Sequence, residues 1–295
     1  MRDFIFICLL AMSLISCEKL TLDQLAFPSE KLDSYTFSNY NGEIGIDETM
    51  YIDDSKKHLV ELTSTDISTG DQYKIYGVYI GDITTISSDS IILYFHGQSK
   101  HMDHYFSRAA LLANVGGKYN YGVFMIDYRG YGMSEGESTE QGLYEDGEAA
   151  ISWLKNQGAD QNRVFYYGYS LGAIPIIDRA AYRTDFKPKK LILEAPLASV
   201  ENLVHNSTVI NVDPGFVTTL EFNNAEKIKD VSCPLLWMHG KEDTYIAISN
   251  GELIYGNHNA GEKIAVRVDG SDHSEIPPKY GIDNYMNEIL NFIQD

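Results

Sequence analysis

The sequence predicts an α/β fold in which a mostly parallel sheet of eight strands carries helices on both faces. Short, continuous apolar runs recur along the chain, a pattern typical of strands that are buried on both faces. Helical stretches alternate with these runs, which favours parallel strands joined by crossover helices. No linker rich in Pro, Gly or Ser interrupts the alternation, so we expect one domain over residues 57–295.

The predicted elements follow from the spacing of apolar residues. Alternation of apolar and polar residues over 58–65 and 72–80 predicts an antiparallel pair, joined by a turn that contains Gly70. Six buried strands are expected at 91–95, 122–126, 164–167, 191–193, 235–238 and 264–268. Helices are expected near 102–114, 141–156, 171–182, 246–257 and 282–293. The segment 197–230 is longer than one crossover needs and is expected to form a short lid.

Composition excludes several classes of protein. Of the 295 residues, 44% are hydrophobic, which is enough to bury a sizeable core and excludes a disordered acidic chain. The 42 acidic residues outnumber the 23 Lys and Arg, giving a net charge of −19, so we expect no nucleic-acid partner. The cysteines, Cys8, Cys17 and Cys233, form no CxxC spacing, which excludes a disulfide scaffold and a zinc ribbon.

The N-terminal residues have the pattern of an export signal. Arg2 gives a short basic start, and residues 4–15 are almost wholly apolar but too few to span a bilayer. The following LISC sequence resembles the lipobox of bacterial lipoproteins, which implies cleavage before Cys17 and acylation of its thiol. We therefore expect a signal peptide at 1–16 and a tether at 17–56, with a lipid anchor at Cys17. The alternative is a buried N-terminal helix with a chance cysteine.

This anchor would hold the protein on a membrane of the bacterial cell envelope, on the periplasmic or surface side. Cys8 would be removed with the signal peptide, and Cys233 would remain as a packed free thiol.

A G-x-S-x-G sequence follows directly after the predicted strand at 164–167. Gly168 and Gly172 flank Ser170, and an apolar helix begins near Leu171. A sharp turn between a strand and a helix exposes the serine and needs small flanking residues. The positive end of the helix dipole also favours developing negative charge at this point. Ser170 is the predicted nucleophile.

A serine hydroxyl needs a nearby base, and the base needs an acid that orients it. Asp243 follows the strand at 235–238, and His273 follows the last strand. The chain order of Ser170, Asp243 and His273 is that of α/β-hydrolases and differs from the order in the chymotrypsin-like and subtilisin-like proteases. We therefore predict a catalytic triad of these residues.

Other acids and histidines compete for these roles. Glu242 and Glu194 remain open as the acid, whereas Asp272 adjoins His273 and is poorly placed to accept from its imidazole. His96 and His239 each precede a glycine at a strand end, where a packed structural histidine is the expected outcome.

The remaining histidines have little support for a catalytic or metal-binding role. His101 and His104 flank Asp103 but lack a third ligand, so we expect no metal, and no cofactor is implied. Nothing nearby supports a role for His58, His205 or His258.

An acyl-transfer transition state also needs donors for its oxyanion. In this fold the backbone N–H after the nucleophile supplies one, here that of Leu171. The second is expected from the loop after the strand at 91–95, and the backbone N–H of Gln98 is our choice. This loop lacks the HGGG sequence of the lipases and carboxylesterases.

From about residue 58 to its end, the chain resembles the α/β-hydrolase superfamily. The DYRGYGMSEG sequence at 127–136 and the GLYED sequence at 142–146 resemble those of small serine hydrolases. That group includes protein depalmitoylases, lysophospholipid lipases and serine aminopeptidase-like proteins. The resemblance implies that residues 127–136 shape the rim of the active site. A loop ion pair between Arg129 and Asp127 accounts for these two residues, and we assign them no catalysis.

The leading hypothesis is a membrane-tethered serine hydrolase that cleaves an acyl ester or thioester through an acyl-enzyme. A serine peptidase of the aminopeptidase or oligopeptidase type is the alternative, since the same triad supports it. A non-catalytic surface lipoprotein is a third possibility. Acyl length, leaving group and oligomeric state are left open by the sequence.

Overall fold

The computed structural model describes residues 27–38, 40, 42–202 and 219–294. Its strands are β1 (Lys57–Thr65), β2 (Gln72–Ile80), β3 (Ile91–Phe95), β4 (Gly122–Asp127), β5 (Val164–Tyr169), β6 (Lys190–Glu194), β7 (Leu235–Gly240) and β8 (Lys263–Val268). Its longer helices are α3 (Met102–Ala113), α4 (Glu140–Asn156), α5 (Ala173–Tyr182), α9 (Ser249–Asn257) and α11 (Ile282–Gln294). Two short helices, α8 (Asn224–Lys227) and α10 (Ile276–Tyr280), have no counterpart among the predicted elements.

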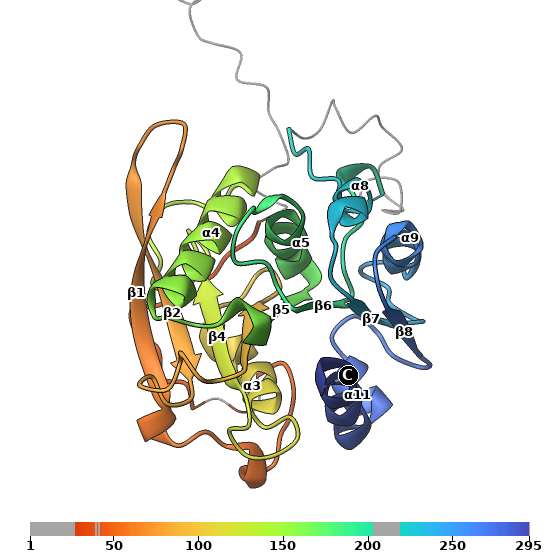
Figure 1. Cartoon of the computed structure of the whole chain (residues 1–295), viewed down its shortest axis with the longest axis horizontal. Helices are drawn as coiled ribbons and strands as arrows, with labels where there is room; N and C mark the ends of the chain where they lie inside the picture. The colour runs from red at the N-terminus through yellow and green to blue at the C-terminus, as the bar shows by residue number, and fades with distance from the viewer. Residues whose placement is uncertain (1–26, 39, 41, 203–218, 295) are drawn as a thin grey trace, which may run out of the picture.

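The eight strands form one sheet in the order β1-β2-β4-β3-β5-β6-β7-β8, and the labelled strands follow this order from left to right in Figure 1. β2 pairs antiparallel with both β1 and β4, and every other neighbouring pair is parallel. Each residue of β3, β4, β5, β6 and β7 is buried, which explains their continuous apolar sequences. The predicted mostly parallel sheet of eight strands is confirmed.

Helices cover both faces of the sheet, so the domain has two apolar cores. One core lies under α4, α5, α8 and α9. The other lies under α3 and α11 on the opposite side (Figure 1). The expected helix at 171–182 begins later, because Ser170–Gly172 forms a single 3-10 turn before α5.

A buried ionic cluster joins α3 to the sheet. The guanidinium of Arg108, which is fully buried, donates to Glu194 at 2.5 Å and to Glu43 at 2.5 Å. Tyr285 on α11 donates a hydrogen bond to Glu194 at 2.9 Å. The guanidinium also lies over the ring of Tyr169, 4.3 Å from its centroid. Both buried carboxylates are therefore paired, as the low dielectric of the interior requires.

The segment before β1 differs from the tether that its composition suggested. Within residues 27–56, the described side chains of Phe37 and Ile52 are buried in the core under α3. The backbone N–H of Phe37 donates to Asp103 at 2.9 Å, and Glu43 pairs with Arg108. The polar residues that suggested a tether thus meet partners on the domain, which sequence composition cannot reveal.

The predicted signal peptide at 1–16 and the lipidation residue Cys17 lie outside the described residues. In the part of the chain that the structure describes, no helix has both the length and the apolar character needed to cross a membrane. Cys233 is a free thiol, and burial raises its pKa to about 12.

The predicted lid at 197–230 is described only at its two ends, because residues 203–218 lie outside the described part. Its last stretch belongs to the body of the domain, since Phe222, Ala225 and Ile228 are buried in the core under α5.

The turn before α5 lies so close to the end of β3 that one added methyl group at Gly172 should destabilise the fold. A Cβ at Gly172 would lie 2.0 Å from the carbonyl oxygen of Phe95, so Gly172→Ala has to displace the backbone after β3. We expect a loss of about 2–3 kcal/mol in the free energy of unfolding, measured by urea denaturation and circular dichroism. Gly256→Ala on α9 is the matched control, since its Cβ would meet nothing within 4 Å. That change should leave stability equal or raise it by up to about 1 kcal/mol. Equal stability of the two variants would contradict the close approach.

Candidate active site

Three predicted residues come together at the carboxyl edge of the sheet. Ser170 follows β5, Asp243 lies in the loop after β7, and His273 lies in the loop after β8. The Nε2 atom of His273 is 2.8 Å from the Oγ atom of Ser170, and its Nδ1 atom is 2.7 Å from Oδ2 of Asp243. Neighbouring parallel strands end at the same edge, which brings residues distant in sequence into one hydrogen-bonded line.

The backbone at Ser170 is held in an unusual conformation. Its φ of 51° lies in the left-handed region, which residues other than glycine rarely adopt. Close packing leaves this turn little freedom, because a Cβ at Gly168 would lie 2.6 Å from a methyl carbon of Ile176. Strain of this kind persists where the surroundings determine the conformation, and it is common at functional sites. The turn places the Ser170 hydroxyl against His273.

The carboxylate of Asp243 is well provided with donors. The backbone N–H groups of Tyr245 and Ile246 donate to its Oδ1 at 2.9 and 2.7 Å. Burial alone would raise the pKa of Asp243, but hydrogen bonds from His239 and His273 outweigh it and hold that pKa well below its ordinary value. The group therefore stays ionised and can stabilise an imidazolium at His273.

His239 contacts Asp243, a contact that its predicted role as a packed histidine did not include. Its Nδ1 accepts from the indole N–H of Trp237 at 3.3 Å, so its Nε2 carries the proton. That Nε2 lies 3.2 Å from Oδ2 of Asp243 and 2.9 Å from the carbonyl oxygen of Ile246. The sequence signal was available, since His239 stands at the end of β7, four residues before Asp243.

The two predicted oxyanion donors lie on segments that touch. Gly172, the residue after Leu171, approaches the backbone carbonyls of Phe95 and His96, two residues before Gln98. The carbonyl oxygen of Gln98 accepts from the hydroxyl of Tyr105 at 2.6 Å.

Tyr245 contacts both Gln98 and His273, and the sequence predicted no role for it. The side-chain amide of Gln98 donates to its hydroxyl, and its ring centroid is 5.1 Å from that of His273. Tyr245 is 57% exposed, so an exposed aromatic side chain lies beside the candidate base.

The competing acids have other partners. Glu194 belongs to the buried cluster around Arg108. Glu242 is exposed and accepts from the backbone N–H of Gly270 at 2.6 Å. Asp272 accepts from the backbone N–H of His273 at 2.8 Å, while the ring of that histidine binds Asp243. The geometry favours Asp243 as the orienting acid.

The ion pair suggested for Arg129 and Asp127 is wrong. Arg129 pairs with Asp146 at 2.8 Å and with Glu145, both on α4. Asp127 instead pairs with His96, whose Nε2 lies 2.9 Å from its Oδ1. The sequence could not anticipate this exchange because each partner comes from a distant segment.

Metal binding finds no support at His101 and His104. Among the described residues, no group of three or more His, Cys, Asp and Glu side chains is arranged to hold a metal ion. His101 lies 3.7 Å from Glu30 of the N-terminal segment. His205 is outside the described residues.

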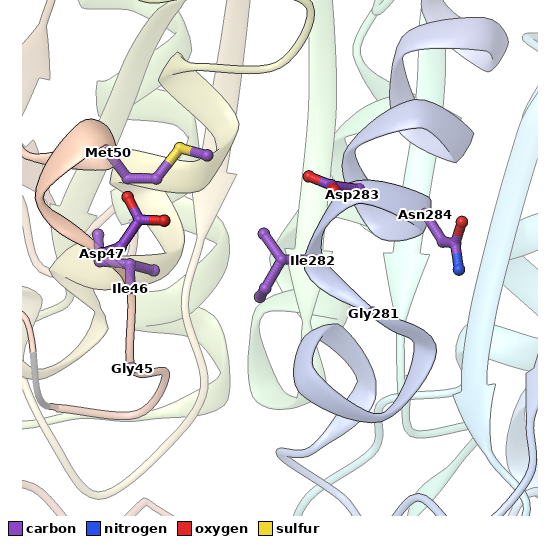
Figure 2. Close-up of a pocket in the computed structure, with 8 residues that line it drawn as sticks. All are labelled: Gly45, Ile46, Asp47, Met50, Gly281, Ile282, Asp283 and Asn284. Atoms are coloured by element: carbon purple, nitrogen blue, oxygen red, sulfur yellow. The ribbon is translucent and has the colours of Figure 1, made fainter.

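A pocket of about 610 Å³ lies away from these residues, between the N-terminal segment and the start of α11 (Figure 2). Its lining residues are Gly45, Ile46, Asp47, Met50, Gly281, Ile282, Asp283 and Asn284. None of them belongs to the predicted site, and we assign this pocket no chemistry.

Solved structures share this fold at low sequence identity. An esterase of Pyrococcus furiosus, Pf2001, superposes with a TM-score of 0.66 and 17% identity over 91% of this chain and 98% of that one. The esterase RhEst1 of Rhodococcus gives a TM-score of 0.59 and 16% identity over 80% of this chain and 98% of that one. The acylaminoacyl peptidase of Pyrococcus horikoshii gives a TM-score of 0.55 and 18% identity, over 82% of this chain and 41% of that one.

Sequence comparison gives closer relatives. A family described as serine aminopeptidase, S33 matches residues 86–222. The lysophosphatidylserine lipase ABHD12 of Macaca fascicularis is 32% identical over 186 residues, covering 57% of this chain and 45% of the relative. The chain thus spans about half the length of the ABHD12 relatives that it matches.

One relative is matched over most of its length. A protein of Acanthamoeba polyphaga mimivirus, named as a candidate alpha/beta hydrolase, L404, is 30% identical over 203 residues. The match covers 68% of this chain and 73% of that protein. This relationship and the sheet topology show that the chain belongs to the α/β-hydrolase superfamily.

Proposed function

We propose that the protein is a serine hydrolase that cleaves an acyl ester or thioester through an acyl-enzyme intermediate. The hydrogen-bonded line from Asp243 through His273 to Ser170 is the observation that carries this proposal. A nucleophile, a base within hydrogen-bond reach and an acid that fixes the base are the arrangement that acyl transfer by serine requires.

In the proposed first step, the Oγ atom of Ser170 attacks the substrate carbonyl carbon while Nε2 of His273 takes its proton. The ionised carboxylate of Asp243 stabilises the imidazolium and holds the ring. His273 then gives the proton to the leaving group, and the acyl group stays on Ser170. Water attacks this ester with His273 again as base, which releases the acid and restores the serine.

The oxyanion of each tetrahedral intermediate needs donors that are in place beforehand. The backbone N–H of Leu171 stands at the start of a helical turn, where N–H groups lack intrahelical partners. We assign it as one donor and the backbone N–H of Gln98 as the other. Loss of one such donor typically lowers kcat by about 10²–10³-fold.

Named relatives guide the choice of substrate. ABHD12 is called a lysophosphatidylserine lipase, and Pf2001 and RhEst1 are called esterases. A monoacyl glycerophospholipid is therefore the first natural ester to test. The peptidase alternative draws support from the family described as serine aminopeptidase and from the acylaminoacyl peptidase structure.

We further propose that Cys17 carries a lipid anchor after removal of residues 1–16, as the LISC sequence implies. An anchor of this kind would hold the active site near a bilayer, where lipid esters are presented.

The nucleophile is tested with a fluorophosphonate probe, which reacts with activated serines. Wild-type protein should label, and Ser170→Ala should neither label nor turn over any substrate, since it lacks the attacking oxygen. Ser152→Ala on α4 is the matched control and should label as wild type does. A wild type that stays unlabelled would contradict the assignment of Ser170.

The substrate class is tested with a panel of p-nitrophenyl esters of several lengths, a palmitoyl thioester, a lysophospholipid and aminoacyl amides. Turnover of the amides alone would replace the ester proposal with the peptidase.

The acid is tested by Asp243→Asn, which removes the charge and keeps the shape. We expect kcat to fall by about 10⁴-fold, because the neutral amide favours the wrong tautomer of His273. Glu242→Gln, the competing acid, should keep kcat close to wild type. The opposite ranking would exchange the two roles.

The same variant has a signature in the pH dependence of stability. The lowered pKa of Asp243 means that its ionised form stabilises the fold above the ordinary Asp pKa of about 3.9. This stabilisation is lost as the pH falls below that value toward the pKa in the folded state. The difference in unfolding free energy between wild type and Asp243→Asn should therefore shrink between about pH 5 and pH 2, measured by urea denaturation. A pH-independent difference would contradict the lowered pKa.

The anchor is tested by feeding a palmitate analogue to bacterial cells that make the protein. Wild type should take up the label and partition with membranes, whereas Cys17→Ala should do neither. Cys233→Ala, the control, should keep both properties, because Cys233 lies within the folded domain. Equal label on wild type and Cys17→Ala would exclude acylation at this residue.

A further inference from the structure

The N-terminal segment contacts both loops that flank the candidate site. The backbone N–H of Ser99, in the loop after β3, donates to the carbonyl oxygen of Pro28 at 3.0 Å. The backbone N–H of Gly132, in the loop after β4, donates to the carbonyl oxygen of Glu30 at 2.8 Å. A segment that precedes both the expected domain and the matched family region therefore lies against the oxyanion loop.

Tyr35 adds side-chain contacts to the loop after β4 and to Asp127 at the end of that strand. Its hydroxyl donates to Oδ2 of Asp127 at 2.6 Å and accepts from the backbone N–H of Met133 at 3.0 Å. Burial first, and then the neighbouring Asp127 carboxylate, raise the pKa of Tyr35, so its hydroxyl keeps the proton that it donates. A Cβ at Gly132 would lie 2.1 Å from Oδ2 of Asp127 and 2.5 Å from the Tyr35 hydroxyl. The missing side chain at Gly132 thus makes room for this hydrogen bond.

Asp127 is fully buried and directs its other oxygen toward His96. Its Oδ1 accepts from Nε2 of His96 and from the backbone N–H of Met102, both at 2.9 Å. A buried carboxylate needs such donors, and the Tyr35 hydroxyl is the donor to the second oxygen. Tyr35 therefore helps to fix the orientation in which Asp127 holds the ring of His96.

His96 connects this carboxylate to the oxyanion loop. Its Nδ1 lies 2.7 Å from the carbonyl oxygen of Gly97, and its Nε2 faces Asp127. Both ring nitrogens thus lie within hydrogen-bond distance of an oxygen, so the ring links the carboxylate to the loop. The fully buried ring is paired with the Asp127 carboxylate on one side and contacts the Gly97 carbonyl on the other.

The carbonyl of Gly97 and the N–H of Gln98 belong to the same peptide group. No cis peptide bond occurs among the described residues, so these two groups point in opposite directions. A side chain that holds the Gly97 carbonyl therefore fixes the direction of the Gln98 N–H. The adjacent carbonyls are held as well, that of His96 by Tyr128 at 2.7 Å and that of Gln98 by Tyr105 at 2.6 Å.

We propose that Tyr35 is a positioning residue for the second oxyanion donor, acting through Asp127 and His96 on the peptide between Gly97 and Gln98. The inference rests on the proposed function, in which the Gln98 N–H stabilises the oxyanion. The N-terminal segment then supports catalysis as well as stability.

Tyr35→Phe tests the proposal, because it removes one oxygen and keeps the ring that stacks on Phe37 at a centroid distance of 5.2 Å. With p-nitrophenyl acetate as substrate, we expect kcat to fall by about 10-fold while KM changes little. The loss should be smaller than for a missing donor, since the N–H is misdirected and not removed. Affinity for a trifluoromethyl ketone, whose serine adduct carries an oxyanion, should weaken by a similar factor.

Tyr40→Phe is the matched control. Tyr40 is buried in the same segment, and its hydroxyl bonds the carbonyl of Ile52 at 3.3 Å, away from Asp127. This variant should keep kcat at the wild-type value. Equal losses in both variants, an unchanged kcat in Tyr35→Phe, or a rise in KM alone would each overturn the proposal.

A double variant tests whether the groups act in one line. Combining Tyr35→Phe with Asp127→Asn should lower kcat no further than Asp127→Asn alone, whereas independent effects would multiply. If Tyr35→Phe does not fold, the test uses Asp127→Asn alone, and a wild-type kcat in that variant overturns the proposal.

Fluorophosphonate labelling of Ser170 distinguishes a failure of the proposed function from a failure of the role of Tyr35. A wild type that does not label refutes the proposed function, whereas a folded, labelled Tyr35→Phe with wild-type kcat refutes only the role of Tyr35.

Discussion

The buried guanidinium of Arg108 holds together the segments that pack around the turn at Ser170. It neutralises Glu194 at the end of β6 and Glu43 in the N-terminal segment, and it supports the ring of Tyr169, the residue before Ser170. Removal of one partner from such a cluster would leave a buried charge unpaired, which typically costs about 3–5 kcal/mol. The cluster therefore makes α3, the sheet and the N-terminal segment dependent on one another, directly beneath the strained turn.

The N-terminal segment contributes to two networks that serve different ends. Glu43 completes the ionic cluster under the turn, and Tyr35 completes the donors of Asp127 beside the loop after β3. A chain that began at residue 57 would lose both contributions, and it would expose the core residues that Phe37 covers under α3.

Much of the fold, and the residues that form the hydrogen-bonded line at the candidate site, could be predicted from the sequence, because both depend on local patterns. Strands buried on both faces produce continuous apolar runs, and the turn at Ser170 needs the glycines that make its motif recognisable. The docking of residues 27–56 could not be predicted, because polar side chains look alike whether they meet water or a partner such as Asp103. For His239 the spacing of four residues to Asp243 is visible in the sequence, but a packed histidine and one that contacts the acid can share this position, so the spacing alone does not decide between them.

The docking of the N-terminal segment depends on the absence of a side chain at Gly132. Its backbone has a φ of +50°, and a side chain there would fill the space of the hydrogen bond between Tyr35 and Asp127. A larger residue at position 132 would therefore displace either the Tyr35 hydroxyl or the Asp127 carboxylate. The conformation of this single glycine thus decides whether the N-terminal segment can dock on the loop after β4 by the path seen here.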